Sequence, residues 1–251
     1  MNLDEKFERW SDRINPIVVK ELRQTVRSGV LLSSLLAVAG VVMLALFLQL
    51  GMRDLAVAPG QPVGRNIFQL LGQLLFLFCL IIIPVNAAAR MIQERDRHNV
   101  DLIYASLISP GAIVRGKLAV GGYQVFLFFM ICAPFLFVTS LLRGIDLLSI
   151  TAVLLIGFVL IMVELQVAIF VGSLNSARAV RVILGVIGAA LTLPLLLLVF
   201  DGCMRVIAGQ GVKGGFRLVF SKNGFVLLLI AGPIIGALYA LSAALVGRHC
   251  G

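Results

Sequence analysis

Six apolar stretches, each long enough for a membrane-crossing helix, dominate this chain of 251 residues. They cover residues 30–50, 67–89, 118–142, 147–172, 182–200 and 224–247. A hydrocarbon core about 30 Å thick requires roughly 20 apolar residues in a helix, so each stretch is long enough to span it. Lipid offers no partner to an unpaired backbone amide, so the spans must be helical. We therefore predict an all-α integral membrane protein with six transmembrane helices.

Composition leaves little of the chain for a soluble domain. Hydrophobic residues make up 60% of the sequence and charged residues only 13%, against roughly 45–50% and 25% in soluble domains. Only one acidic or basic residue, Glu164, lies inside the six stretches. We expect residues 1–29 to form an N-terminal cytoplasmic segment and residues 30–251 to form the transmembrane domain.

The distribution of Lys and Arg predicts the orientation of the helices. Of the 21 basic residues, 14 lie before the first stretch, in the loops after the second and fourth, and after the sixth. Cytoplasmic loops carry an excess of Lys and Arg, so both termini are predicted to be cytoplasmic. The net charge of +9 then comes from basic residues beside the membrane helices, which set the orientation of the helices and contact anionic headgroups. We expect membrane lipid as a partner and no nucleic acid.

Residues 14–27 carry an amphipathic helical pattern ahead of the first span. The apolar side of the helical wheel holds Ile14, Ile17, Val18, Leu22, Thr25 and Val26, and the opposite side holds Lys20, Arg23 and Arg27. A helix with this pattern lies in the headgroup plane. The alternative is a basic flank that only fixes topology. Glu21 falls within the apolar side, and we expect it to have a basic partner from another segment.

The cytoplasmic loop 90–117 has more pattern than a connector requires. It begins with the charge cluster Glu94-Arg95-Asp96-Arg97, and Asn99 and Ser109-Pro110 are typical helix starts. Between them lie apolar residues, including Leu102 and Tyr104. Apolar side chains framed by charges on a cytoplasmic loop indicate a docking site for a partner. A solvated connector is the alternative.

Three further features lie in or beside the spans. Glu164 and Gln166 are polar residues in the fourth stretch; an intramembrane carboxylate is a candidate functional site, although we favour a structural, interhelical hydrogen bond. Small residues recur at every fourth position of the sixth stretch, which allows close helix packing: Gly232, Gly236, Ala240 and Ala244. The glycine-rich segment 201–223 is predicted to be either a re-entrant or interfacial element or a flexible loop.

Two segments resemble the permease subunits of ABC-2 type transporters. The first is Asn15-Pro16 with Lys20-Glu21-Leu22-Arg23-Gln24. The second is Glu94-Arg95-Asp96-Arg97 followed by Asp101-Leu102, Ser109-Pro110 and Arg115-Gly116-Lys117-Leu118. The chain departs from the family at His98-Asn99, where Gly-Thr is frequent. The resemblance implies an elbow helix containing Lys20, Glu21, Arg23 and Arg27. It also implies a coupling helix that docks on the ATPase, formed by the loop with Glu94, Asp101, Leu102, Tyr104, Ser109, Pro110 and Lys117.

The resemblance further implies an assembly of two permease copies, identical or paralogous, with two ATPase subunits, in a plasma membrane such as the bacterial inner membrane. No stretch matches the phosphate-binding pattern G-x-x-x-x-G-K-[ST]. We therefore expect no catalytic residue and no metal or cofactor on this chain, with ATP and Mg²⁺ bound by the partner. The alternatives are a stand-alone secondary transporter or channel and, least favoured, an intramembrane enzyme.

Overall fold

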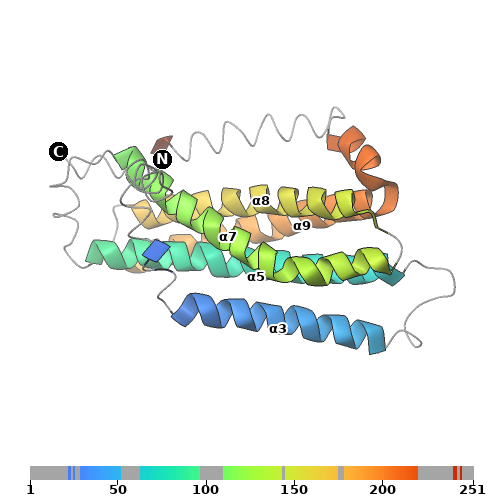
Figure 1. The fold of residues 1–251 in the computed structure, drawn as a ribbon. Helices are drawn as coiled ribbons and strands as arrows, with labels where there is room; N and C mark the ends of the chain where they lie inside the picture. Colours follow the sequence, from blue (N-terminus) through green and yellow to red (C-terminus); the bar gives the residue numbers. More distant parts are fainter. Residues whose placement is uncertain are drawn as a thin grey trace, which may run out of the picture.

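A computed structural model describes residues 22–23, 25, 29–51, 63–96, 110–142, 145–174, 178–219, 240–241 and 244. All the regular secondary structure among these residues is helical. Five long helices follow one another: α3 (Gly29–Gly51), α5 (Val63–Asp96), α7 (Pro110–Leu141), α8 (Leu147–Ser173) and α9 (Arg178–Val219). They lie side by side as an elongated bundle (Figure 1).

Five helices are long and apolar enough to cross a membrane, and they confirm five of the predicted spans. The apolar portions run Gly29–Gly51, Gly64–Arg90, Ile113–Leu141, Leu147–Ser173 and Val182–Ile207. The sixth predicted span, 224–247, and the elbow helix lie almost entirely outside the described residues. The chain is thus a multi-pass membrane protein by the length and composition of its helices.

The bundle is built around α5 and α8. Helix α5 packs against α3, α7, α8 and α9, whereas α8 packs against α5, α7 and α9. The core consists of side chains from all five helices, including Phe68 and Phe76 of α5, Phe128 of α7 and Ile161 of α8. Helix α3 lies at one edge of the bundle and contacts α5 and α7 (Figure 1).

Helix α3 illustrates how a lipid-exposed span is recognised. Its buried residues form one stripe at helical spacing: Leu31, Leu35, Val38, Val42 and Leu46. Most of the remaining positions are also apolar yet exposed, among them Leu36 and Phe47. A helix that is apolar all round but buried on one side only is a helix whose other faces contact hydrocarbon.

Glycines set the closest approach between α7 and α8. A Cβ placed on Gly121 would meet the side chain of Leu165, and one on Gly122 would lie 3.5 Å from Met162 Sδ. Small residues at such a crossing let two membrane helices pack with their backbones close together. The two glycines therefore allow α8 to pack closely against α7.

Helix α9 differs most from the sequence prediction. The predicted span ends at residue 200, but the helix continues without interruption through Asp201 to Val219. For residues 201–219 the prediction of a flexible loop is therefore wrong. The ribbon of α9 turns near its C-terminal end (Figure 1), in the part of the helix that contains four glycines (Gly209, Gly211, Gly214 and Gly215). Residues 220–223 lie outside the described residues.

Candidate functional site

Three of the residues predicted to couple to an ATPase lie near the end of α5 or the start of α7. Glu94 is in the last turn of α5, and Pro110 is the first residue of α7. Lys117 lies two turns into α7 and is buried. The remaining residues assigned to this loop lie outside the described residues: Asp101, Leu102, Tyr104 and Ser109. The structure thus places the two helix ends that flank the predicted coupling segment and does not test its role.

The end of the predicted elbow segment contacts α5. Arg23 is helical and exposed, whereas Thr25, on the predicted apolar side, is fully buried. The Arg90 guanidinium of α5 donates a hydrogen bond to Thr25 Oγ1. This contact links the N-terminal segment to the helix that leads into the predicted coupling loop. The other elbow residues, Lys20, Glu21 and Arg27, lie outside the described residues.

Glu164 lies in the seam between α8 and α9. Its side chain is 3% exposed, and its carboxyl group is within hydrogen-bonding reach of the Thr192 hydroxyl on α9. That hydroxyl also lies 2.9 Å from the Gly188 carbonyl oxygen, and its single proton serves one acceptor at a time. Glu164 Oε2 has no hydrogen-bond partner among the described residues.

A neutral carboxyl group suits this geometry. Protonated Glu164 can donate to Thr192 Oγ1 while Thr192 donates to the Gly188 carbonyl oxygen, so each of the two hydroxyl protons has an acceptor. An ionised carboxylate would leave a buried charge with one oxygen unpartnered, which is costly in an apolar seam. Gln166, two residues along α8, is also buried. The interhelical role of both side chains stays a prediction.

A polar cluster joins α5 and α9 toward the end of the bundle that is predicted to face outward, which we call the outer end. Gln73 Nε2 donates to Asp201 Oδ1 at 2.5 Å, and the Arg205 guanidinium lies 2.7 Å from Asp201 Oδ2. Arg65 donates to the Arg205 carbonyl oxygen at 3.4 Å. We call these four residues the outer polar cluster. Asp201 and Arg205 lie in the apolar portion of α9, Val182–Ile207, which extends beyond the predicted end of the fifth span at residue 200.

An aromatic layer lies directly beside the outer polar cluster. The rings of Phe76 and Phe200 stack with their centroids 3.9 Å apart and their planes 12° from parallel. Gly157 of α8 lies against this stack, since a Cβ there would be 3.2 Å from the Phe200 ring. Next to it, a Cβ on Gly72 would be 2.5 Å from Met204 Cε. The two glycines let α5, α8 and α9 converge at one level.

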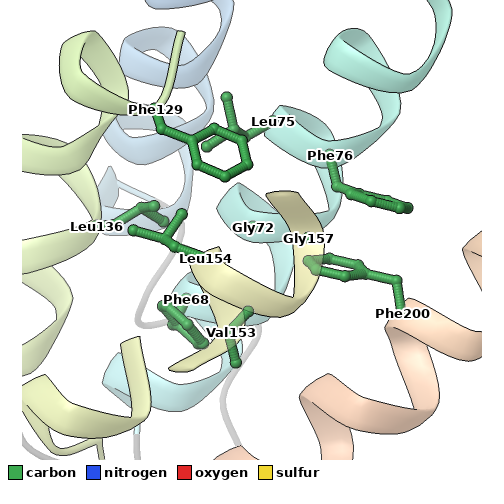
Figure 2. A pocket seen from close by; sticks show the side chains of 10 residues that line it. All are labelled: Phe68, Gly72, Leu75, Phe76, Phe129, Leu136, Val153, Leu154, Gly157 and Phe200. Carbon is green, nitrogen blue, oxygen red and sulfur yellow. The ribbon is translucent and has the colours of Figure 1, made fainter. Parts of the chain in front are cut away.

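A small apolar cavity lies at this level of the bundle (Figure 2). Its volume is about 10 Å³, no more than one water molecule requires. Ten residues from four helices line it: Phe68, Gly72, Leu75, Phe76, Phe129, Leu136, Val153, Leu154, Gly157 and Phe200. In Figure 2 the Phe76 and Phe200 side chains lie together on the side of α9. An apolar cavity of this size is closed to any larger molecule in this conformation.

The small residues predicted to pack span six are described only in part. Ala240 and Ala244 are helical and exposed, while Gly232 and Gly236 lie outside the described residues. No group of three or more potential metal ligands occurs among the described residues.

The comparisons with known proteins give no family for this chain. No protein-family model matches the sequence, and no curated protein matches it significantly. The function is therefore argued from the residues themselves.

Sequence reasoning missed the outer polar cluster and the Arg90–Thr25 contact. Gln73 is one polar residue within an apolar stretch, and Asp201 directly follows one. A hydrogen-bonding residue inside one span and a carboxylate at the edge of another are a signal for an interhelical pair. The signal was present, but nothing in the sequence says that these two helices are neighbours.

Proposed function

We propose that the chain is the transmembrane permease subunit of an ABC transporter, of the ABC-2 type. A separate ATPase subunit would supply the energy, and this chain would supply the path across the membrane. The observation that carries the proposal is the segment 94–118, whose residues resemble the family's coupling loop. It is flanked by two helices that pack against each other, α5 and α7.

The helices on either side of that segment are suited to transmit a movement. Helix α5 continues beyond its apolar portion, which ends at Arg90, as far as Asp96, and α7 begins at Pro110, before its apolar portion starts at Ile113. Both are unbroken to the outer side, where α5 carries Gln73 and Phe76. A displacement of the coupling segment by a closing ATPase would therefore move the outer ends of the same helices.

The N-terminal segment would move with α5. Arg90 binds Thr25, so the elbow segment is attached to α5 at the point where the helix leaves the membrane. In this proposal the complex contains a second permease copy, identical or paralogous, and resides in a plasma membrane such as the bacterial inner membrane. Neither ATP nor Mg²⁺ is bound by this chain.

A stand-alone secondary transporter or channel is the second candidate. Polar pairs inside the membrane favour it, because such proteins use paired polar groups to handle ions and substrates. Two examples among the described helices are Gln73 with Asp201 and Glu164 with Thr192. Because both pairs also connect neighbouring helices, a structural role explains them as well as transport does, and we place this candidate second.

Co-purification separates the two candidates. The full-length tagged chain, extracted in mild detergent, is expected to bring down a protein with the pattern G-x-x-x-x-G-K-[ST]. Glu94→Ala and Leu102→Ala should each reduce the amount recovered by at least about tenfold, as expected for central interface residues. Ser33→Ala is the control, since Ser33 bonds only to its own helix, at Val30 O. A chain that purifies alone, and whose transport is unchanged by both loop substitutions, would instead be a stand-alone transporter.

A further inference from the structure

The outer polar cluster carries more positive than negative charge. Asp201 uses both carboxylate oxygens, one for Gln73 and one for Arg205. Arg65 instead donates to a neutral carbonyl oxygen, that of Arg205. Among the described residues no carboxylate forms an ion pair with Arg65. Two guanidinium groups therefore face one carboxylate, and the cluster has a net charge of +1.

The positive groups are accessible from outside the bundle. The Arg205 side chain is 71% exposed, and Arg65 is half-buried. Both lie at the outer ends of spans, at the depth of lipid headgroups. A guanidinium presents several N–H donors in a planar fork that matches the oxygens of a phosphate group. The cluster thus has the charge and the donors for one anionic headgroup.

An apolar space lies beneath these arginines. Phe68 and Gly72 are three and seven residues from Arg65, so they lie on the same face of α5, and both line the cavity. On α9, Phe200 lines the cavity and Asp201 belongs to the cluster. The positively charged groups and the apolar space are therefore adjacent on both helices.

Two side chains close this space. Met204 Cε occupies the notch at Gly72, and a methionine side chain changes rotamer easily. Phe200 belongs to α9, which packs mainly against α8 and α5 among the described helices. A chain of methylene groups entering between α5 and α9 has to displace the end of Met204 and the Phe200 ring and to separate Gln73 from Asp201.

We propose that the outer ends of α5 and α9 form a binding site for an anionic amphiphile, with a phosphate-type head on Arg65 and Arg205 and an unbranched apolar chain in the cavity beside Gly72. The charge excludes a cationic head, and the apolar lining excludes a purely hydrophilic anion. The same chemistry comes from two sources: a resident membrane phospholipid, or a molecule that the protein moves. The site does not depend on the proposed ATPase partner, so its failure and that of the proposed function are separate.

Native mass spectrometry of the full-length chain, in a neutral detergent, tests the site directly. Dodecyl phosphate is the probe, with inorganic phosphate and dodecyltrimethylammonium as the tail-free and cationic comparisons. We expect one dodecyl phosphate per chain, and no adduct of either comparison compound at the same concentration. A chain that purifies with one anionic phospholipid, displaced by the probe, identifies the bilayer as the source. If the chain purifies without a bound phospholipid but binds the probe, the natural ligand is a molecule that the protein moves.

Variants assign the binding to the named residues. Arg65→Gln with Arg205→Gln should weaken dodecyl phosphate binding at least about tenfold, because two charge-assisted hydrogen bonds are lost. Gly72→Leu, which fills the notch, should weaken it while leaving the head contacts in place. Arg115→Gln is the matched control, since Arg115 is exposed near the N-terminal end of α7 and does not belong to the outer polar cluster. Unchanged binding in the double arginine variant, with its elution volume and thermal stability preserved, overturns the proposal. Equal binding of the cationic amphiphile does the same.

Discussion

Helices α5 and α9 are both apolar spans, yet the bundle covers them very differently. In the most apolar window of α5, 56% of the residues are buried, against 6% for α9. Helix α5 packs against all four other described helices, whereas α9 packs mainly against α8 and α5. The position of α5 is thus set by four neighbouring helices, and that of α9 mainly by one face packed against α8 and α5.

Specific contacts mark three levels of this α9 face. Phe200 packs against Gly157 and Phe76, Thr192 meets Glu164, and Gly185 approaches Val171. The outer level adds the hydrogen bond between Gln73 and Asp201. If this comparison is right, substitutions at these points will destabilise α9 out of proportion to the area they bury, while its exposed apolar residues will tolerate change.

The largest effect is expected from Phe200→Ala. The variant removes the stacked ring and enlarges the apolar cavity, and large-to-small changes at buried aromatic residues cost about 3–5 kcal/mol in soluble cores. The free energy of unfolding in an SDS titration should fall by a value near the lower end of that range. Leu198→Ala, at a position 71% exposed, is the control. Equal losses for both variants would mean that α9 is held by general burial.

Gly157→Val is expected to cost less, about 1–3 kcal/mol, because it overpacks the layer beneath Phe200. Its Cβ alone would lie 3.2 Å from the Phe200 ring. Gly202→Val is a matched control on α9, since nothing lies within 4 Å of a Cβ there. The same unfolding titration measures both. Should Gly202→Val be the more damaging variant, the assignment of the α9 contacts is wrong.

A smaller effect is expected from the hydrogen bond of the outer polar cluster. A double-mutant cycle of Gln73→Leu and Asp201→Ala should give a coupling energy of about 0.6–1.7 kcal/mol, between the mean and the maximum measured for hydrogen bonds between membrane helices. A second cycle, Ser33→Ala with Gln73→Leu, should give no coupling, because Ser33 bonds within α3. A zero value in the first cycle would remove this contact from the account.

The smallest effect is expected from Glu164→Gln. The amide can occupy the same space and can donate to Thr192 as a protonated carboxyl group does. Stability should change by less than about 0.5 kcal/mol, and transport should remain largely intact in whole-cell or vesicle assays. Abolished transport with normal assembly would show that the carboxyl group acts in the pathway.

The sequence predicts α5 better than it predicts α9, for a physical reason. Hydropathy finds a span from the absence of charge, and α5 between Ile67 and Ala89 has none. In α9 the charges of Asp201 and Arg205 end the apolar stretch, so the span was predicted to end at residue 200. The helix continues because those charges are paired with each other and with Gln73. Pairing between helices depends on tertiary structure, which a sequence window does not contain.

The candidate sites likewise combine residues that the sequence identifies with contacts that it does not. Glu164 is found from sequence because a carboxylate in the middle of an apolar stretch is conspicuous, but its contact with Thr192 is not. Gly72 and Gly157 look like ordinary glycines of membrane helices until Met204 and Phe200 are placed beside them. Residue types that are unusual for their surroundings were predictable, and partnerships between helices were not.

Photo-cross-linking from position 102 tests the central proposal most directly. A photoreactive phenylalanine analogue replaces Leu102 in the full-length chain, and irradiation is carried out in native membranes. The account predicts one dominant adduct, with an ATPase whose peptides include the phosphate-binding pattern G-x-x-x-x-G-K-[ST]. The same probe at Phe47, exposed on α3, should not label it. Labelling of lipid alone from position 102, with no ATPase adduct, would contradict the assignment of this chain as an ATP-driven permease subunit.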